Sequence, residues 1–290
     1  MSVSIRDPDR IGTTRLTDGR ALGWAEWGPP DGTPVLLCPG AATSRRLGFG
    51  ADSVDGLGVR LVSVDRPGLG ASTPAPDRTF ASFADDIREL SARRGLGRPA
   101  VVGNSQGAPF ALACAVAGVA GAVSLVSAAD ELAAPEFADA LPEGVRALVH
   151  GAAHAPEAAA RHLAAFDADA MWDMVIAASA PSDVAVYRSA AFAASYRCAL
   201  AEAFAPGPGG YVHDTLLAMR RWPFDLEKIA VPVDIWYGEL DTSHSPDRGA
   251  FLSTRIPGAR RHVVADVGGA LLWVHAEPIL RTLLGQHADR

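Results

Sequence analysis

A serine lies between two glycines directly after a short apolar run, in the segment Gly103-Asn104-Ser105-Gln106-Gly107. Residues 99–102 predict a buried strand before it, and residues 108–115 predict a buried helix after it, with Pro109 in the first turn. A serine in such a sharp turn is pushed into a strained backbone conformation, and the residues two before and two after it must be small. The pattern therefore predicts that the Ser105 hydroxyl is an exposed nucleophile.

With this motif, the chain resembles an α/β-hydrolase over nearly its whole length, apart from a helical stretch in its middle. Members of that family carry a nucleophile, an acid and a histidine after three different strands, in that order along the chain. The resemblance implies the α/β-hydrolase fold: a mostly parallel central sheet with helices on both faces and an inserted helical cap. Ser105 matches the nucleophile position.

The resemblance places the acid on the loop after the next-to-last strand. Residues 233–237 predict that strand, which runs into Gly238-Glu239-Leu240-Asp241, the Gly-x-x-Asp pattern of the family. Asp241 is therefore the candidate acid. Glu239, in the same loop, and Asp130, which follows an earlier predicted strand, are the alternatives.

Acyl transfer needs two backbone N–H groups aimed at the oxygen that becomes negative. The resemblance assigns one to Gln106 and the other to the loop after the first central strand, which begins Pro39-Gly40-Ala41. Many relatives have His-Gly there; Pro39 replaces the histidine, but Ala41 keeps the donor position and is the expected second donor. The turn at residues 65–72, which contains Arg66, is also typical of the family, and we interpret it as a structural brace.

The histidine of the family is missing from its usual place. Relatives place it directly after a glycine that follows the last strand, and in Gly268-Gly269-Ala270 that position is an alanine. An alanine can neither accept the serine proton nor give it to a leaving group. Ala270 therefore marks the position of the expected base.

Three interpretations follow from Ala270. The chain is a His→Ala variant of an active hydrolase, or a natural member that binds a small apolar ligand or catalyses a non-hydrolytic reaction, or a hydrolase that uses another histidine. The first is favoured because the remaining machinery is intact, and it predicts an enzyme that is inactivated or slowed. The third has several candidates: His244 shares a loop with Asp241, and His275 lies about 140° around a helix from Ala270. Histidines of the central helical stretch complete this set: His150, His154, His162 and His213.

The expected reaction is attack of Ser105 on a carbonyl carbon, followed by release of the acyl group to water. A carboxylic ester or a lactone is the expected substrate, because residues 40–46 resemble a loop of bacterial esterases that includes some macrolide-lactone hydrolases. The residues matching that loop are Gly40, Ser44 and Arg45. The expected substrate contacts are Ala42, Trp172 and Leu271.

The elements that must position these residues follow an α/β alternation. Apolar runs predict strands at 13–16, 21–27, 35–38, 61–65, 100–104, 123–127, 233–237 and 262–265, and helices are expected at 45–55 and 80–94. Residues 129–222 contain no convincing strand, are rich in alanine and are interrupted by prolines. We therefore predict a hydrolase core of residues 1–128 and 223–290, with residues 129–222 as a helical cap over the carboxyl edge of the sheet.

The bulk composition narrows the class of protein further. The 290 residues are 49% hydrophobic and carry a net charge of −7 without a Lys/Arg-rich run, so neither a nucleic acid nor a membrane surface is an expected partner. No apolar stretch is long enough to span a bilayer, and the first residues lack the pattern of a signal peptide, which predicts a cytoplasmic protein.

The sequence points to no cofactor. No His/Cys/Asp cluster has metal-ligand spacing, and no Gly-x-Gly-x-x-Gly opens a helix after the first central strand, so neither a metal nor a dinucleotide is expected. Cys38, Cys114 and Cys198 are far apart and odd in number, which predicts buried thiols in a reducing compartment. A small-molecule ester or lactone is the expected partner.

Overall fold

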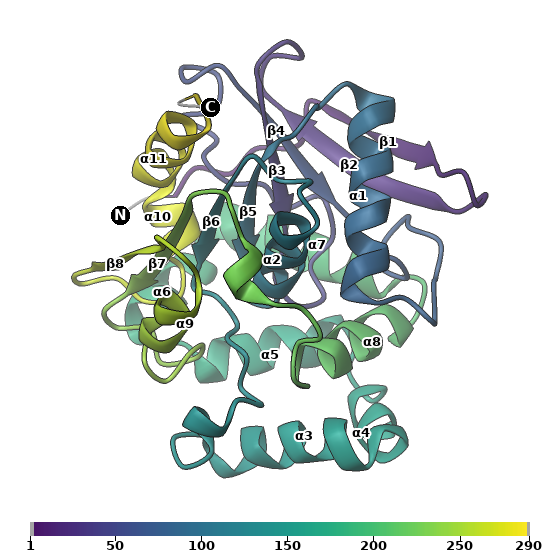
Figure 1. Cartoon of the computed structure of the whole chain (residues 1–290), viewed down its shortest axis with the longest axis vertical. Coiled ribbons are helices and arrows are strands. Elements are labelled where there is room, and N and C mark those ends of the chain that lie inside the picture. Colours follow the sequence, from purple (N-terminus) through teal and green to yellow (C-terminus); the bar gives the residue numbers. More distant parts are fainter. Residues whose placement is uncertain (1–2, 289–290) are drawn as a thin grey trace.

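A computed structural model describes residues 3–288 of the chain and has an eight-stranded sheet at its centre (Figure 1). The strands are β1 (Arg10–Arg15), β2 (Ala21–Trp27), β3 (Thr33–Cys38), β4 (Val59–Val64), β5 (Ala100–Asn104), β6 (Ala122–Val126), β7 (Val233–Gly238) and β8 (Arg260–Val264). Their order in the sheet is β1-β2-β4-β3-β5-β6-β7-β8, with antiparallel pairing only along the β1-β2-β4 edge. The predicted fold class is confirmed.

Helices cover both faces of this sheet, because its central strands are apolar on both sides. Successive residues of a strand point to opposite faces: Val101 of β5 packs in one core cluster and Val102 in the other. The first cluster is closed by α1 (Phe80–Arg94), α2 (Ala108–Val116) and α9 (Ala250–Arg255). The second is closed by α10 (Leu271–Val274) and α11 (Ala276–Ala288), which Figure 1 shows on the opposite face from α1 and α2.

The helix predicted at 80–94 is present with those bounds. Thr79 caps its first turn by accepting the Ser82 N–H, and the Ser82 hydroxyl accepts the Thr79 N–H in return. Gly95 ends the helix with a left-handed backbone (φ 65°), which glycine adopts at little cost.

The helix predicted at 45–55 is wrong, because the segment forms turns instead. Its first residue is held elsewhere: the Arg45 N–H donates to Asp65 Oδ1 at 2.6 Å, and the Arg45 guanidinium pairs with the same carboxylate. Gly50, inside the predicted helix, adopts a left-handed backbone angle (φ 68°) that a helix excludes. Tertiary contacts and glycine geometry therefore outweigh the apolar spacing of this segment.

The chain between β6 and β7 forms a helical insertion with no strand. Its helices are α3 (Glu143–His154), α4 (Pro156–Leu163), α5 (Ala168–Ala178), α6 (Pro181–Tyr187), α7 (Ala190–Phe204) and α8 (Gly209–Ala218), with short 3-10 turns at η2 (Pro135–Phe137) and, just before β7, η3 (Leu226–Lys228). The prolines that interrupt the sequence stand at helix starts, where a missing N–H costs little. In Figure 1, α3, α4, α5 and α8 of this helical insertion lie below the sheet, with α5 and α8 nearer to it than α3 and α4.

Side chains of the helical insertion contact loops that follow the carboxyl ends of four strands. The pairs are Glu202 with Ser44 after β3, Asp214 with Arg66 after β4, Thr215 with Gln106 after β5, and Asp183 with Gly269 after β8. The helical insertion therefore covers the carboxyl edge of the sheet, where ligands of open α/β sheets bind.

Two of the three cysteines are buried. Cys38 and Cys114 are buried as expected, and burial raises the pKa of the Cys38 thiol to about 12. Cys198 on α7 is exposed, so the expectation that it is buried is wrong. Within residues 3–288, no helix is both long and apolar enough to cross a bilayer.

Candidate active site

Ser105 stands at a sharp turn between β5 and α2, within the 3-10 segment η1 (Ser105–Gly107). Its backbone has φ 50°, a left-handed angle that costs a serine energy and that the packing around it maintains. A Cβ on Gly103 would lie 2.8 Å from the Ala108 Cα, and one on Gly107 would lie 2.6 Å from the Pro39 oxygen. The predicted need for small residues at both positions is confirmed.

Ser105, His244 and Asp241 form one continuous hydrogen-bonded chain. His244 Nε2 lies 3.0 Å from the Ser105 hydroxyl, and His244 Nδ1 lies 2.9 Å from both carboxylate oxygens of Asp241. The carboxylate can only accept, so Nδ1 carries a proton and Nε2 is free to accept the serine proton. The favoured interpretation assumed that no histidine reaches this serine and acid; that assumption is wrong.

The local path of the loop after β7 brings His244 back over Asp241. The Asp241 N–H donates to the Gly238 carbonyl at 3.2 Å, and Asp241 Oδ1 accepts the Ser243 N–H at 3.1 Å. An aspartate that binds the backbone N–H two residues on closes a tight turn. This turn places the imidazole beside the carboxylate, although the two residues are only three apart in sequence.

Ala270 does not stand in for the base in this chain. It is buried at the start of α10, in the loop that follows β8. A Cβ on the neighbouring Gly269 would lie 3.1 Å from His244 Cε1, so the imidazole of His244 fills the space beside this glycine. The position named from the sequence is therefore corrected: the histidine that contacts Ser105 and Asp241 comes from the loop after β7 and not from position 270.

Among residues 3–288, none of the other candidate acids and histidines hydrogen-bonds to the Ser105 hydroxyl or to His244. Glu239 is exposed, and Asp130 is buried against the Ser245 hydroxyl at 3.0 Å instead of against His244. His213 donates to the Arg78 carbonyl at 2.7 Å. The remaining histidines pack on rings: His150 on His154, His162 on Phe166 and His275 on Trp236.

The pKa values of Asp241 and His244 are shifted in opposite directions by their contact. Burial raises the pKa of the Asp241 carboxyl, but the imidazole charge and hydrogen bond of His244 lower it more, so this pKa falls to about 2. Burial lowers the pKa of His244, but the carboxylates of Asp241 and Asp183 raise it by more, so it lies above 6.5. The acid is therefore ionised over the whole physiological range.

The loop after β3 lies directly against the serine. A Cβ on Gly40 would stand 3.5 Å from the Ser105 Cβ. Arg66 donates to the Pro39 carbonyl at 2.5 Å and to the Gly40 carbonyl at 2.9 Å. In a trans peptide the C=O and the next N–H point in opposite directions, so the Ala41 N–H is turned away from Arg66.

Within residues 3–288, neither predicted N–H donor has a backbone acceptor outside its own helix or strand. Within residues 3–288, the Ala41 N–H has no acceptor. Gln106 lies in the first turn of a short helical segment, where backbone N–H groups lack intrahelical partners, and its side chain donates to the Thr215 hydroxyl at 3.0 Å.

Arg66 belongs to a buried ionic cluster that confirms the predicted brace. The Arg66 Nε lies 2.7 Å from Asp214 on α8, and the guanidinium of Arg78 pairs with the other oxygen of Asp214. Burial raises the pKa of Asp214, but the two guanidinium groups lower it by more. The cluster links the helical insertion to the loop that carries Ala41.

The three expected substrate contacts stay predictions, and two of them are fully buried in this structure. Ala42 and Leu271 have no exposed surface, because Ala42 packs beneath the helical insertion and Leu271 packs in the core below α11. Trp172, on α5, keeps 6% of its surface exposed and shares a cluster with Ala42 and Ala270. The expectation of a substrate contact at Trp172 stays open.

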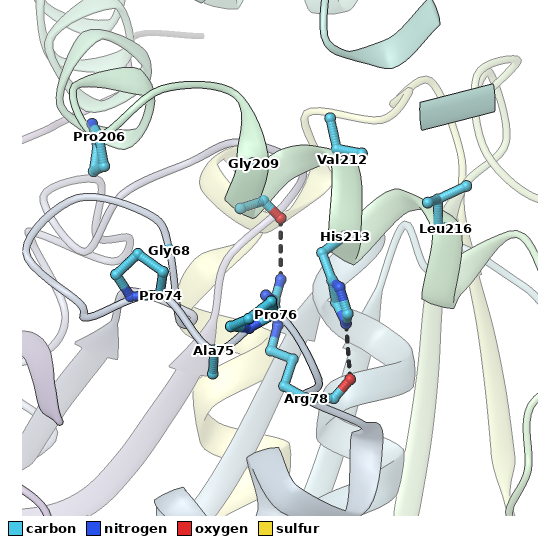
Figure 2. Close-up of a pocket in the computed structure, with 11 residues that line it drawn as sticks. Gly68, Pro74, Ala75, Pro76, Arg78, Pro206, Gly209, Val212, His213 and Leu216 are labelled. Carbon is cyan, nitrogen blue, oxygen red and sulfur yellow. Dashed lines mark hydrogen bonds between the residues drawn. The ribbon is translucent and has the colours of Figure 1, made fainter. Parts of the chain in front are cut away.

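A separate cavity of about 280 Å³ lies between the loop after β4 and α8 (Figure 2). Pro74, Pro76, Pro206, Val212 and Leu216 are among its lining residues. Figure 2 shows the Arg78 and His213 side chains at its edge, each engaged with a backbone carbonyl. The lining includes none of the three residues of the hydrogen-bonded chain. Within the described part of the chain, no group of three or more His, Cys, Asp or Glu could hold a metal ion.

Comparisons with known proteins agree on the architecture. A family model described as alpha/beta hydrolase fold matches residues 33–276. The proline iminopeptidase of Neisseria meningitidis is 33% identical over 118 residues, so the chain matches only 37% of that relative's length and 38% of its own. An esterase from a Rhodococcus species (20% identity, 97% and 98% of the two chains, TM-score 0.67) and the enol-lactonase of Burkholderia xenovorans (18%, 96% and 100%, TM-score 0.68) share the fold.

Proposed function

Because the chain belongs to the alpha/beta hydrolase fold family, we propose that it is a serine hydrolase that cleaves a carboxylic ester or a lactone through an acyl-enzyme on Ser105. The observation that carries this proposal is the unbroken chain from the Ser105 hydroxyl through His244 to Asp241. Its geometry is that of a nucleophile, a base and an orienting acid. The esterase and the enol-lactonase among the structures of similar fold support the substrate class.

In the first half-reaction, the Ser105 oxygen attacks the carbonyl carbon while His244 Nε2 takes the hydroxyl proton. The carbonyl oxygen becomes an oxyanion, which the N–H groups of Ala41 and Gln106 stabilise. His244 then gives its proton to the departing alcohol, or to the ring oxygen of a lactone, and the acyl group stays on Ser105. Asp241 remains ionised and stabilises the imidazolium between these steps.

In the second half-reaction, His244 takes a proton from water and the resulting hydroxide attacks the acyl carbon. The second oxyanion collapses, the acid product leaves, and the proton returns from His244 to Ser105. Every proton moves through one imidazole, so the proposed mechanism needs no base at position 270.

The test is hydrolysis of p-nitrophenyl acetate, butyrate and octanoate, a δ-lactone and proline p-nitroanilide by the purified chain. We expect turnover of at least one ester or lactone. Ser105→Ala and His244→Ala should each lower kcat/KM by roughly 10³-fold or more, because such residues act as a unit. Thermal unfolding of each variant shows that its fold is retained.

His275→Gln is the matched control, because His275 is another part-buried histidine near the sheet but contacts Trp236 instead of Ser105. It should keep the activity of the parent chain. Absence of turnover on the whole panel would contradict the proposed function and favour a ligand-binding protein. Turnover of the anilide alone would move the proposal from esters to amides.

A further inference from the structure

Asp183 joins the helical insertion to the loop that follows β8. It lies on α6, and its side chain is buried. Its Oδ2 accepts the Gly269 N–H at 2.7 Å, and its Oδ1 accepts the Ala270 N–H at 3.1 Å. Both carboxylate oxygens therefore accept hydrogen bonds from backbone N–H groups of the loop at residues 266–270.

The same loop lies against His244 at Gly269. A Cβ on Gly268 would lie 2.6 Å from the Asp183 Cγ, whereas a Cβ on Gly269 would lie 3.1 Å from His244 Cε1. Two glycines in succession thus allow a carboxylate and an imidazole to approach the same stretch of backbone. Asp183 and His244 therefore both lie against residues 268–270 of this loop.

The carboxylate of Asp183 has no Lys or Arg partner among residues 3–288. The titratable groups that face it are His244, Asp241 and Tyr187. Burial raises the pKa of Asp183, and the two amide hydrogen bonds oppose this increase. His244 is the group among them that gains a positive charge during the proposed reaction.

We propose that Asp183 is a positioning residue that holds residues 266–270 against His244 and stabilises the imidazolium of His244 by its negative charge. This inference rests on the proposed function, since it requires His244 to carry the serine proton. It implies that the helical insertion contributes to proton transfer, because the second carboxylate near the imidazole comes from α6 and not from the sheet.

The first test is Asp183→Asn, which keeps the shape of the side chain but removes its charge and one of its two acceptor oxygens. The pH profile of kcat/KM for the best ester of the panel should show an acid limb displaced to lower pH, because neutral His244 is then easier to form. We expect kcat to fall by about 10-fold, with KM changed by less than about 3-fold, because the interaction strengthens only when the imidazole is charged. A merely structural residue would not move the acid limb.

Asp167→Asn is the matched control. Asp167 also belongs to the helical insertion and also accepts a backbone N–H, that of Ala170 at 2.9 Å, but it caps α5 at an exposed position. This variant should keep the parent pH profile. If Asp183→Asn kept both the parent kcat and the parent acid limb while the parent chain was active, the role of Asp183 would be refuted and the proposed function would stand.

A second pair of variants tests the contact from the other side and covers a failure of Asp183→Asn to fold. Gly268→Ala places a methyl group against the Asp183 carboxylate and should displace it, whereas a Cβ on Gly285 meets nothing within 4 Å. Gly268→Ala should lower kcat and shift the acid limb in the same direction, and Gly285→Ala should do neither. Parent-like behaviour of Gly268→Ala would contradict the proposal.

A measurement without turnover separates the two proposals. In Ser105→Ala protein, the pKa of the His244 imidazole can be followed by NMR, and adding Asp183→Asn should lower it. An unchanged pKa would overturn the role of Asp183, even if no substrate of the enzyme were known.

Discussion

At the residue scale, the proposed function depends on where an imidazole lies in space and not on where its residue lies in sequence. Proton transfer requires Nε2 near the serine oxygen and Nδ1 near a carboxylate. His244 meets both conditions from the loop of Asp241, with distances of 3.0 and 2.9 Å. At position 270, where the family pattern places a histidine, an alanine is therefore compatible with proton transfer through His244.

The sequence predicted Ser105 and Asp241 because their signals are local: each stands at a fixed offset from a buried strand. It named His244 only as an alternative, because that contact depends on the turn between Asp241 and Ser243. Hydrogen bonds of this kind leave no periodic pattern in a sequence. The contact between His244 and Ser105 could therefore be identified only from the structure.

The pH dependence of the proposed activity follows from His244. Its folded pKa is raised above 6.5 by Asp241 and Asp183, and the reaction needs the neutral form. Activity should therefore be full above that pKa and should be lost as the pH falls through it. A pH profile of kcat/KM with a stable ester measures this limb, and an acid limb below pH 6.5 would contradict the electrostatics described above.

Introducing a histidine at position 270 tests the corrected assignment. Ala270→His should not raise kcat, because His244 already occupies the space next to Gly269. The alanine is buried, so the larger side chain should destabilise the protein by about 1–3 kcal/mol. Ester hydrolysis and thermal unfolding check both points. A gain of 10-fold or more in kcat would restore position 270 as the site of the base.

At the element scale, the loops at the carboxyl edge of the sheet are fixed by buried ions. Arg66 holds two carbonyls of the loop after β3 and shares Asp214 of α8 with Arg78. The predicted strands agree with the observed ones to within a few residues, because burial on both faces gives clear apolar runs in the central strands β3 to β7. The helix expected at 45–55 failed because Arg45 is bound to Asp65, a contact that no local pattern contains.

Arg66 and Arg78 form a matched pair for a test of the oxyanion site. Arg66→Met and Arg78→Met each remove one partner of Asp214, but only Arg66 contacts the Pro39 and Gly40 carbonyls. Both variants should be less stable. Arg66→Met should in addition lower kcat by roughly 10²-fold and weaken binding of a trifluoromethyl ketone, because the Ala41 N–H is no longer oriented. Equal kinetic losses in both variants would show that Arg66 has no special role.

At the scale of the whole molecule, the helical insertion and the sheet are joined by polar contacts between residues far apart in the chain. The hydrogen bond between Asp183 and Gly269 is an example. The sequence predicted that the helical insertion lies over the sheet edge, but it could not predict which of its residues contact which loop. Fold class follows from the alternation of strands and helices. The pairing depends on how six helices pack, which their alanine-rich sequence leaves unspecified.

Stability should depend on pH through Asp130. Burial raises its folded pKa from 3.8 to about 6, so the folded state binds this proton more tightly than the unfolded state. The stabilisation is therefore present at low pH and is lost as the pH rises through 6. Asp130→Asn should increase the free energy of unfolding at pH 8 by about 2–3 kcal/mol relative to the parent, and by little at pH 4. Urea denaturation at both pH values measures the difference, and a variant less stable at pH 8 than the parent would disprove this account.

The acid and the base share one short loop, and this changes how the site can deform. When each group follows its own strand, thermal motion can separate acid from base and base from nucleophile independently. Here Asp241 and His244 lie on the same turn, so a movement of that turn as a unit carries the carboxylate and the imidazole together. A movement of this turn as a unit therefore changes the 3.0 Å distance between His244 Nε2 and the Ser105 hydroxyl more than the 2.9 Å distance between His244 Nδ1 and Asp241.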